Sequence, residues 1–261
     1  MKTMNIFILS FLIFQISCAQ YWGTRIKGNG TIEAENRTTS SYDAVKISGF
    51  FNVELVQGDE GNIVIEGESN LISHIETTVR NKTLSVKVKK GVRLKPSFGK
   101  KILITIPIES IHKIALVGSG QVEGKTTITN ENLELSIAGS GEMNLDVAAN
   151  KIESSIAGSG DLELNGNAKV WEASIAGSGD ITLTGKVEDR LDISISGSGD
   201  VVADQLKAKD VEISISGSGD VSVYCDGTLS TSVSGSGDIR YSGSPTIEKV
   251  STSGSGSVIR S

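Results

Sequence analysis

Apolar and polar residues alternate along most of this chain, a pattern typical of β-strands. Between residues 118 and 261 the alternation keeps a fixed register with the tripeptide Gly-Ser-Gly. This tripeptide begins at eight positions, 18 to 21 residues apart: Gly118, Gly139, Gly158, Gly177, Gly197, Gly217, Gly235 and Gly254. Counted from the first glycine as position 0, positions −6, −2 and +4 are almost all apolar, and +6 mostly so. Because strand side chains alternate between faces, the even positions form the inward set and the odd positions the outer surface.

Identical strands that recur about every 19–20 residues predict an all-β, single-stranded parallel β-helix, in which each coil buries its inner residues by stacking on its neighbours. Parallel crossovers favour the right-handed sense, so we expect a right-handed solenoid. We expect residues 20–40 to be an irregular lead-in and residues 41–117 to be a less regular β part. That part is predicted to continue directly into the repeats of residues 118–261.

The parity of the repeat places both glycines of each tripeptide on the inward side, at a sharp corner with no room for a Cβ atom. The predicted corner glycines are Gly139, Gly141, Gly158, Gly160, Gly177, Gly179, Gly197, Gly199, Gly217, Gly219, Gly235 and Gly237.

An aspartate follows the tripeptide in five repeats, at Asp161, Asp180, Asp200, Asp220 and Asp238. The preferred interpretation is that each carboxylate accepts a backbone N–H at its corner, as Asx residues do in turns. A calcium ladder is the alternative, because hard cations bind carboxylate oxygens. Catalysis is disfavoured because an acid–base pair needs two carboxylates in different environments, whereas this column repeats one environment. We predict no catalytic residue and no cofactor.

The N-terminus has the features of an export signal. Lys2 is followed by the apolar run Ile6–Phe14, which is too short to span a bilayer. Residues 1–19 are therefore predicted to be a signal peptide, cleaved after Ser17 or after Ala19. Cleavage after Ser17 would leave Cys18 as a lipid-modified N-terminus, and both alternatives stay open.

Charge is distributed unevenly along the chain, whose formal net charge is −6. Residues 118–261 carry 21 acidic and 10 basic residues, whereas residues 1–117 carry 10 acidic and 15 basic ones. The stretch Arg80–Lys101 holds nine basic residues and no acidic one. It is interpreted as a solvated strand face or as a footing on anionic lipid or glycan. Each tripeptide lies within a β run and not in the loop-to-helix context of a phosphate site, so nucleotide binding is not supported. Nucleic acid is not an expected partner.

Several short stretches of the first half resemble the opening of the auto-transporter adhesin head GIN domain family. They are Tyr42–Val53, Gln57–Asp59, Asn70–Leu71, Ile75–Thr77 and Lys82–Leu84, and the repeated Gly-Ser-Gly-Asp is similar to the family's later part. The resemblance implies an exported bacterial β-helical domain whose function is undetermined, with no catalytic residues to carry over.

We therefore predict an exported, non-enzymatic β-helix of the cell envelope or surface that serves as a scaffold or an adhesin-like head. The alternatives are a carbohydrate-active or carbohydrate-binding β-helix and a calcium-stabilised structural solenoid. The expected partner is a glycan or protein of the envelope or the extracellular space, with membrane contact only through a lipid anchor. The last repeat has Thr252 and Ser257 at otherwise apolar and acidic positions. We expect end-to-end self-association at this coil, because an uncapped solenoid end is an open strand edge.

Overall fold

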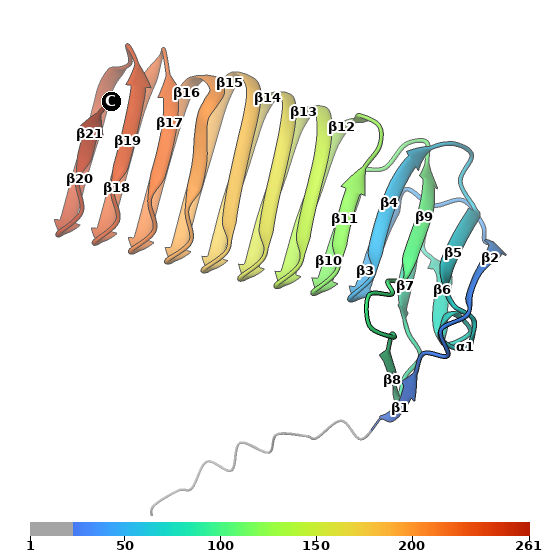
Figure 1. Cartoon of the computed structure of the whole chain (residues 1–261). Coiled ribbons are helices and arrows are strands. Elements are labelled where there is room, and N and C mark those ends of the chain that lie inside the picture. The colour runs from blue at the N-terminus through green and yellow to red at the C-terminus, as the bar shows by residue number, and fades with distance from the viewer. Residues whose placement is uncertain (1–22) are drawn as a thin grey trace, which may run out of the picture.

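The computed structural model describes residues 23–261, so the predicted signal peptide and Cys18 lie outside the described residues. These residues form strands and one short helix, α1 (Ser69–Ile72). No helix in this part of the chain is long and apolar enough to cross a membrane. Most strands join in one large sheet that coils into a β-solenoid of about eight turns, and the all-β parallel solenoid predicted from the repeats is confirmed (Figure 1).

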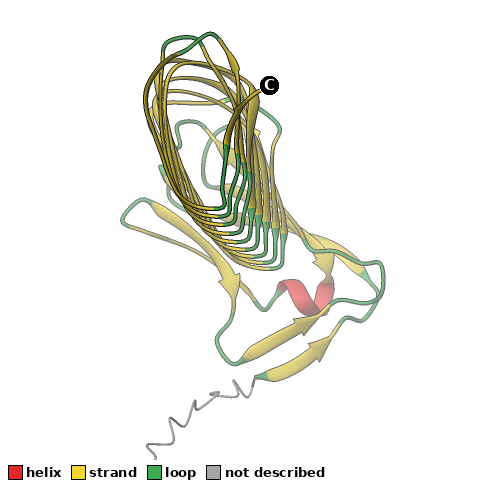
Figure 2. Ribbon diagram, turned by 90° about the vertical axis from the view of Figure 1, so that its left-hand side faces the viewer, coloured by secondary structure: helices red, strands yellow, loops and turns green. Residues whose placement is uncertain are grey.

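In the middle of the solenoid each coil is one strand of 17 or 18 residues that bends around the side opposite the Gly-Ser-Gly corner, whereas the coils before and after it consist of two shorter strands (Figure 2). The strands of this region are β10 (Lys113–Gly118), β11 (Gln121–Gly124), β12 (Ile128–Gly139), β13 (Glu142–Gly158), β14 (Asp161–Gly177), β15 (Asp180–Gly197), β16 (Val201–Gly217), β17 (Val221–Cys225), β18 (Thr228–Gly235), β19 (Ile239–Gly243), β20 (Thr246–Gly254) and β21 (Val258–Arg260). Neighbouring coils pair in parallel with the tripeptides aligned, as in Gly158 opposite Gly177.

Small irregularities on the far side of the coil absorb the variation in repeat length. The register between β14 and β15 shifts between Ala168 and Val170, and that between β15 and β16 shifts again between Val187 and Arg190. A bulge adds a residue while the ladder continues on either side of it. In β13 to β16 the opposite side is therefore a continuous strand with bulges, whereas in the later coils it is a short bend, as between β17 and β18.

The N-terminal coils are stacked in a different order from their order along the chain. β3 (Ala44–Gly49) and β4 (Asn52–Gln57) pair with β10 and β11 on one side. On the other side they pair in parallel with β7 (Thr83–Val88) and β9 (Leu103–Ile108). The chain thus lays down the β3–β4 coil first, adds β7 and β9 outside it, and then returns to the inner side to begin the repeats.

Antiparallel strands cover the outer part of this N-terminal region. β2 (Ile32–Thr38) pairs with β5 (Asn62–Glu68), β5 also pairs with β9, and β6 (Ile75–Arg80) pairs with β7. A separate parallel pair joins β1 (Thr24–Lys27) to β8 (Val92–Lys95). The expectation of an irregular lead-in over residues 20–40 is therefore wrong for β1 and β2. Their partners lie 24 to 68 residues later in the chain, and the lead-in sequence alone contains no sign of them.

One continuous hydrophobic core runs through the N-terminal region and the solenoid. In the repeats it is built from the even positions, as the alternation predicts. Trp171 is fully buried there, and its indole N–H donates to the hydroxyl of Ser154, 3.2 Å away in the preceding coil. The small residues Ser154 and Ala173 lie two positions from the core column that holds this indole, which leaves room for its volume.

Candidate functional site

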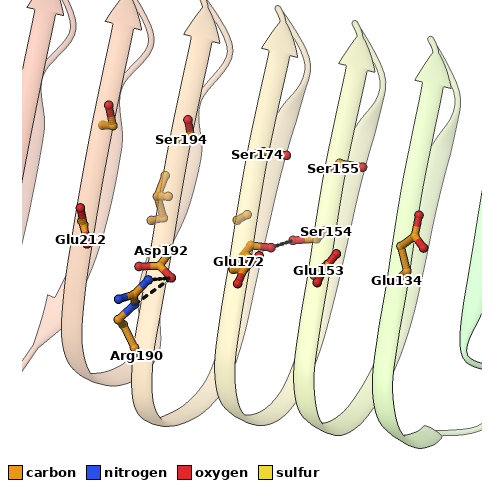
Figure 3. A pocket seen from close by; sticks show the side chains of 13 residues that line it. Glu134, Glu153, Ser154, Ser155, Glu172, Ser174, Arg190, Asp192, Ser194 and Glu212 are labelled. Atoms are coloured by element: carbon orange, nitrogen blue, oxygen red, sulfur yellow. Dashed lines mark hydrogen bonds and ion pairs between the residues drawn. The ribbon is translucent and has the colours of Figure 1, made fainter.

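A row of carboxylates crosses five neighbouring strands on the outer face of the solenoid that precedes the Gly-Ser-Gly corner. Strand pairing places these residues directly opposite one another, one per coil, and Figure 3 shows them side by side. This acidic row consists of Glu134, Glu153, Glu172, Asp192 and Glu212. Neighbouring strands are about 4.8 Å apart, so the row repeats polar groups at that spacing along the rod.

Basic side chains neutralise part of the acidic row. Lys151 lies 2.6 Å from a carboxylate oxygen of Glu153 and 2.9 Å from one of Glu172. These hydrogen bonds, Glu153 first, raise the pKa of Lys151. Arg190 lies 2.7 Å from Asp192, and the hydrogen bond to that carboxylate raises the pKa of the guanidinium. Because like charges at strand spacing repel one another, these cations allow the row to form.

The row borders a shallow groove of about 450 Å³. The carboxylates line it together with the hydroxyl-bearing residues Ser155, Ser174 and Ser194, which project from the same strands (Figure 3). The Oδ1 atom of Asp192 is buried and accepts no hydrogen bond from residues 23–261. A buried acceptor without a partner carries an uncompensated desolvation cost, and because this oxygen is buried it does not itself face a ligand at the surface.

A second row of small hydroxyls runs parallel to the acidic row, two residues closer to the corner. Strand pairing aligns Ser136, Ser155, Ser174, Ser194, Ser214, Ser232 and Ser251, one in each of seven coils. The outer face therefore offers carboxylate acceptors beside hydroxyls that both donate and accept, in a regular array. We call the acidic row and this serine row together the polar face.

The Gly-Ser-Gly corner is shaped by contacts between coils. The first glycine of each tripeptide has a positive φ, +130° at Gly158 and +141° at Gly177, which side chains rarely adopt. A Cβ on Gly177 would overlap the carbonyl oxygen of Gly158 in the preceding coil. The first glycine is only half-buried, so its constraint comes from the neighbouring backbone, whereas the sequence argument placed it in a crowded interior. The second glycine is buried, and a Cβ there would meet both that backbone and an inward isoleucine, as at Gly160.

The predicted aspartate ladder forms hydrogen bonds between coils rather than within its own turns. Oδ1 of Asp180 accepts the backbone N–H of Asp200, Asp200 accepts that of Asp220, and Asp220 accepts that of Asp238. Asp238 ends the series by accepting the N–H and the hydroxyl of Ser257. These two hydrogen bonds, the hydroxyl first, lower the pKa of Asp238.

The first aspartate of the column is arranged differently. The N–H of Asp161 donates to the carbonyl of Gly141 at 2.9 Å, and its carboxylate accepts no hydrogen bond from the described residues. Within residues 23–261 no three His, Cys, Asp or Glu side chains are close enough to hold a metal ion, so the calcium ladder stays a prediction. Cys225 is fully buried, and burial raises the pKa of its thiol, as suits a small core residue.

The sequence model of a family described as "Putative auto-transporter adhesin, head GIN domain" matches residues 41–185 and 167–245. The chain belongs to this family. No functionally curated protein matches this head GIN chain.

Solved structures have the same architecture. A "putative lipid binding protein" from Parabacteroides distasonis is 30% identical with a TM-score of 0.85, and the match covers 91% of this chain and 100% of that one. A "putative adhesin" from Parabacteroides merdae is 22% identical with a TM-score of 0.84, over 91% and 99% of the two chains. Another from Bacteroides fragilis is 24% identical with a TM-score of 0.70, over 90% and 100%. The last two show the fold alone.

The acidic row was missed by the sequence reasoning, although the register needed to find it was available. Position −5 of the repeat holds Glu134, Glu153, Glu172, Asp192 and Glu212 in succession. This second column is less apparent than the aspartates, which directly follow the tripeptide. Those aspartates mostly bond to backbone, whereas the acidic row faces a groove.

Proposed function

We propose that this head GIN protein is an exported, non-enzymatic adhesive head of the cell envelope or surface, and that its polar face binds an extended, hydroxyl-rich glycan. The observation that carries the proposal is the in-register array of carboxylates and serine hydroxyls across neighbouring coils. A flat array with a constant axial repeat suits a linear polymer, whose polar groups also recur at a constant spacing.

The balance of charge favours a neutral sugar polymer over a strongly basic protein as ligand. Lys151 and Arg190 already neutralise three of the five carboxylates, and Lys113 lies 2.5 Å from a fourth, Glu134. Carboxylates so paired still accept hydrogen bonds from hydroxyl groups, since each has more lone pairs than the ion pair uses.

The geometry of the row argues against an enzyme. Glycosidases separate the roles of two carboxylates by giving them different environments, so that one is an acid and the other ionised. Glu153 and Glu172 instead share one lysine, so their environments are not separated in this way. The family description names an adhesin and no reaction, which also supports a binding role.

A pull-down from intact envelopes tests the proposal. The wild-type chain is compared with a Ser174→Lys and Ser194→Lys variant, which places bulky cations on the polar face. The matched control is Thr182→Lys with Ser222→Lys, beyond the corner on the other face. We expect the wild type and the control to retain a carbohydrate that the polar-face variant does not. Equal capture by all three would contradict the proposed surface.

A further inference from the structure

The β1–β8 pair forms a small arm that is separate from the large sheet, at the N-terminal end of the solenoid (Figure 1). We define the basic arm as residues 23–30 and 89–102, which comprise this pair and its flanking turns. It contains no acidic residue, and its cations are all exposed: Arg25, Lys27, Lys89, Lys90, Arg93, Lys95, Lys100 and Lys101. None of these eight forms an ion pair with any residue in the described range 23–261.

Four of these cations make a square array on the arm. Parallel pairing sets Arg25 opposite Arg93 and Lys27 opposite Lys95, while the alternate residues of the two strands pack against the core. Like charges directly opposite on neighbouring strands are destabilising, and here they occur twice in succession. Elsewhere in the fold, cations such as Lys113 and Lys151 have carboxylate partners within 3 Å. The β1–β8 pair therefore carries a concentrated positive charge with which no carboxylate of residues 23–261 forms an ion pair.

An aromatic side chain projects beside this charge. Phe98 is fully exposed in the turn that follows β8. The turn is fixed rather than loose, because the N–H of Lys100 donates to the carbonyl of Ser97 at 3.0 Å and Gly99 adopts φ +72°. Ser97 in turn donates its N–H and its hydroxyl to the buried carboxylate of Glu68. The fold thus holds a large apolar side chain in water next to unpaired cations.

We propose that the basic arm docks on an anionic phospholipid membrane, with Phe98 inserted at the interface and the arginines and lysines bound to headgroup phosphates. Surface-bound proteins combine these two contributions, an apolar insertion and attraction of cations to anionic lipid. A soluble polyanion would satisfy the cations but leave Phe98 in water, so the aromatic favours a bilayer. The acidic solenoid, at 21 acidic and 10 basic residues over 118–261, would be repelled by the same surface and point away from it.

Vesicle co-sedimentation tests the inference with the chain from Gln20 onward, which keeps every described element and the whole core. Vesicles of phosphatidylcholine are compared with vesicles of equal parts phosphatidylcholine and phosphatidylglycerol. The arm variant carries Arg25→Gln, Lys27→Gln, Arg93→Gln and Lys95→Gln. The matched control removes the same charge from exposed lysines of the solenoid, at Lys169, Lys207, Lys209 and Lys249, each changed to Gln. Circular dichroism melts establish that both variants are folded.

We expect binding to the anionic vesicles only, a loss of at least roughly a hundredfold in the arm variant, and little change in the control. Phe98→Ala is expected to weaken binding roughly tenfold while leaving its salt dependence unchanged. The inference would be overturned by absent binding to anionic vesicles, or by equal losses in the arm variant and the control. Binding to heparin that exceeds vesicle binding and does not depend on Phe98 would also overturn it, in favour of a polyanionic glycan.

Discussion

Oδ1 of Asp180 lies 2.9 Å from the backbone nitrogen of Asp200, one coil further along the solenoid. The same bond recurs from Asp200 to Asp220 at 2.7 Å. In the earlier coils the corresponding N–H groups donate to glycine carbonyls, as Asp161 does to Gly141. At the corner, the aspartate carboxylate thus accepts the N–H that a main-chain carbonyl accepts in the earlier coils. The aspartate column therefore has a structural role.

Replacing Asp200 with Ala should therefore destabilise the solenoid more than replacing Asp161. Asp200→Ala removes the acceptor of the Asp220 N–H and should cost about 1 kcal/mol, at the low end for a bond to a charged acceptor at an exposed site. Asp161→Ala removes the same charge at the same repeat position but breaks no hydrogen bond with the described residues. Urea unfolding of both variants measures the difference. Equal losses would mean that charge or turn propensity, rather than the ladder bond, explains the column.

The corner glycines lead to a second prediction. Gly177→Ala should destabilise the protein by about 3 kcal/mol or more, because it combines an unfavourable φ of +141° with overlap of the Gly158 carbonyl. Gly91→Ala is the control, since its φ is also positive, at +79°, but no atom lies within 4 Å of the added Cβ. The control should cost only about 1 kcal/mol. Thermal midpoints of the two variants that coincide would show that the neighbouring coil imposes no restriction.

Glu68 should make the stability of the contact between the basic arm and the rest of the protein depend on pH. Burial alone would raise the pKa of Glu68, but hydrogen bonds from Ser97 and Gly30, with the charge of Lys100, hold it below the usual value. A carboxyl whose pKa is lower in the folded state stabilises fully above its unfolded pKa and loses that effect as pH falls through the folded pKa.

Glu68→Gln should accordingly lower the free energy of unfolding by about 2 kcal/mol at neutral pH, because the amide group of glutamine faces a donor whose hydrogen bond the carboxylate accepted. In acid the loss should be smaller, because the wild-type carboxyl is then protonated. Glu66→Gln, at an exposed position two residues away, serves as the control. Unfolding free energies measured from neutral pH down to pH about 3 follow the difference across the range in which glutamate titrates. A constant difference between the variants over this range would contradict the role given to the Glu68 carboxylate.

The last coil of the described chain should mediate self-association. Among residues 23–261 seven large apolar side chains are exposed, and three of them belong to this coil: Ile247, Val250 and Ile259. β20 and β21 each pair with an earlier coil only, so their outer edges are open. We expect light scattering to detect dimers that form with rising concentration and that Val250→Glu with Ile259→Glu abolishes. Val202→Glu, an exposed apolar position in the middle of the rod, is the control. A monomer at all concentrations would rule this out.

The parts of the fold that could be predicted are those in which each repeat constrains the next. The glycine register and the inward columns predicted the coil, and the buried positions of Trp171 and Cys225 followed from parity alone. The N-terminal stacking could not be predicted in this way. β3 and β4 lie between strands that come later in the chain, and local alternation contains no information about which distant strand will pair. The pairing of β1 with β8 could not be predicted from the sequence for the same reason.

The candidate site was partly accessible from the sequence. Position −5 could have been recognised as an acidic column, but its pairing with Lys151 and Arg190 depends on the side-chain positions of adjacent coils. The basic stretch Arg80–Lys101 was visible as charge. The structure adds that Arg25 and Lys27 lie beside this stretch and that Phe98 is exposed in it, and the proposed membrane contact rests on these additions.

The most direct test of the central claim, that the polar face binds a glycan without cleaving it, is a glycan array followed by a depolymerisation assay on every bound polymer. We expect a linear, hydroxyl-rich glycan to bind to the wild type and to the Thr182→Lys with Ser222→Lys control. The Ser174→Lys with Ser194→Lys variant should lose this binding, and the polymer should not be shortened. Turnover of any bound polymer, or binding that survives in the polar-face variant, would contradict it.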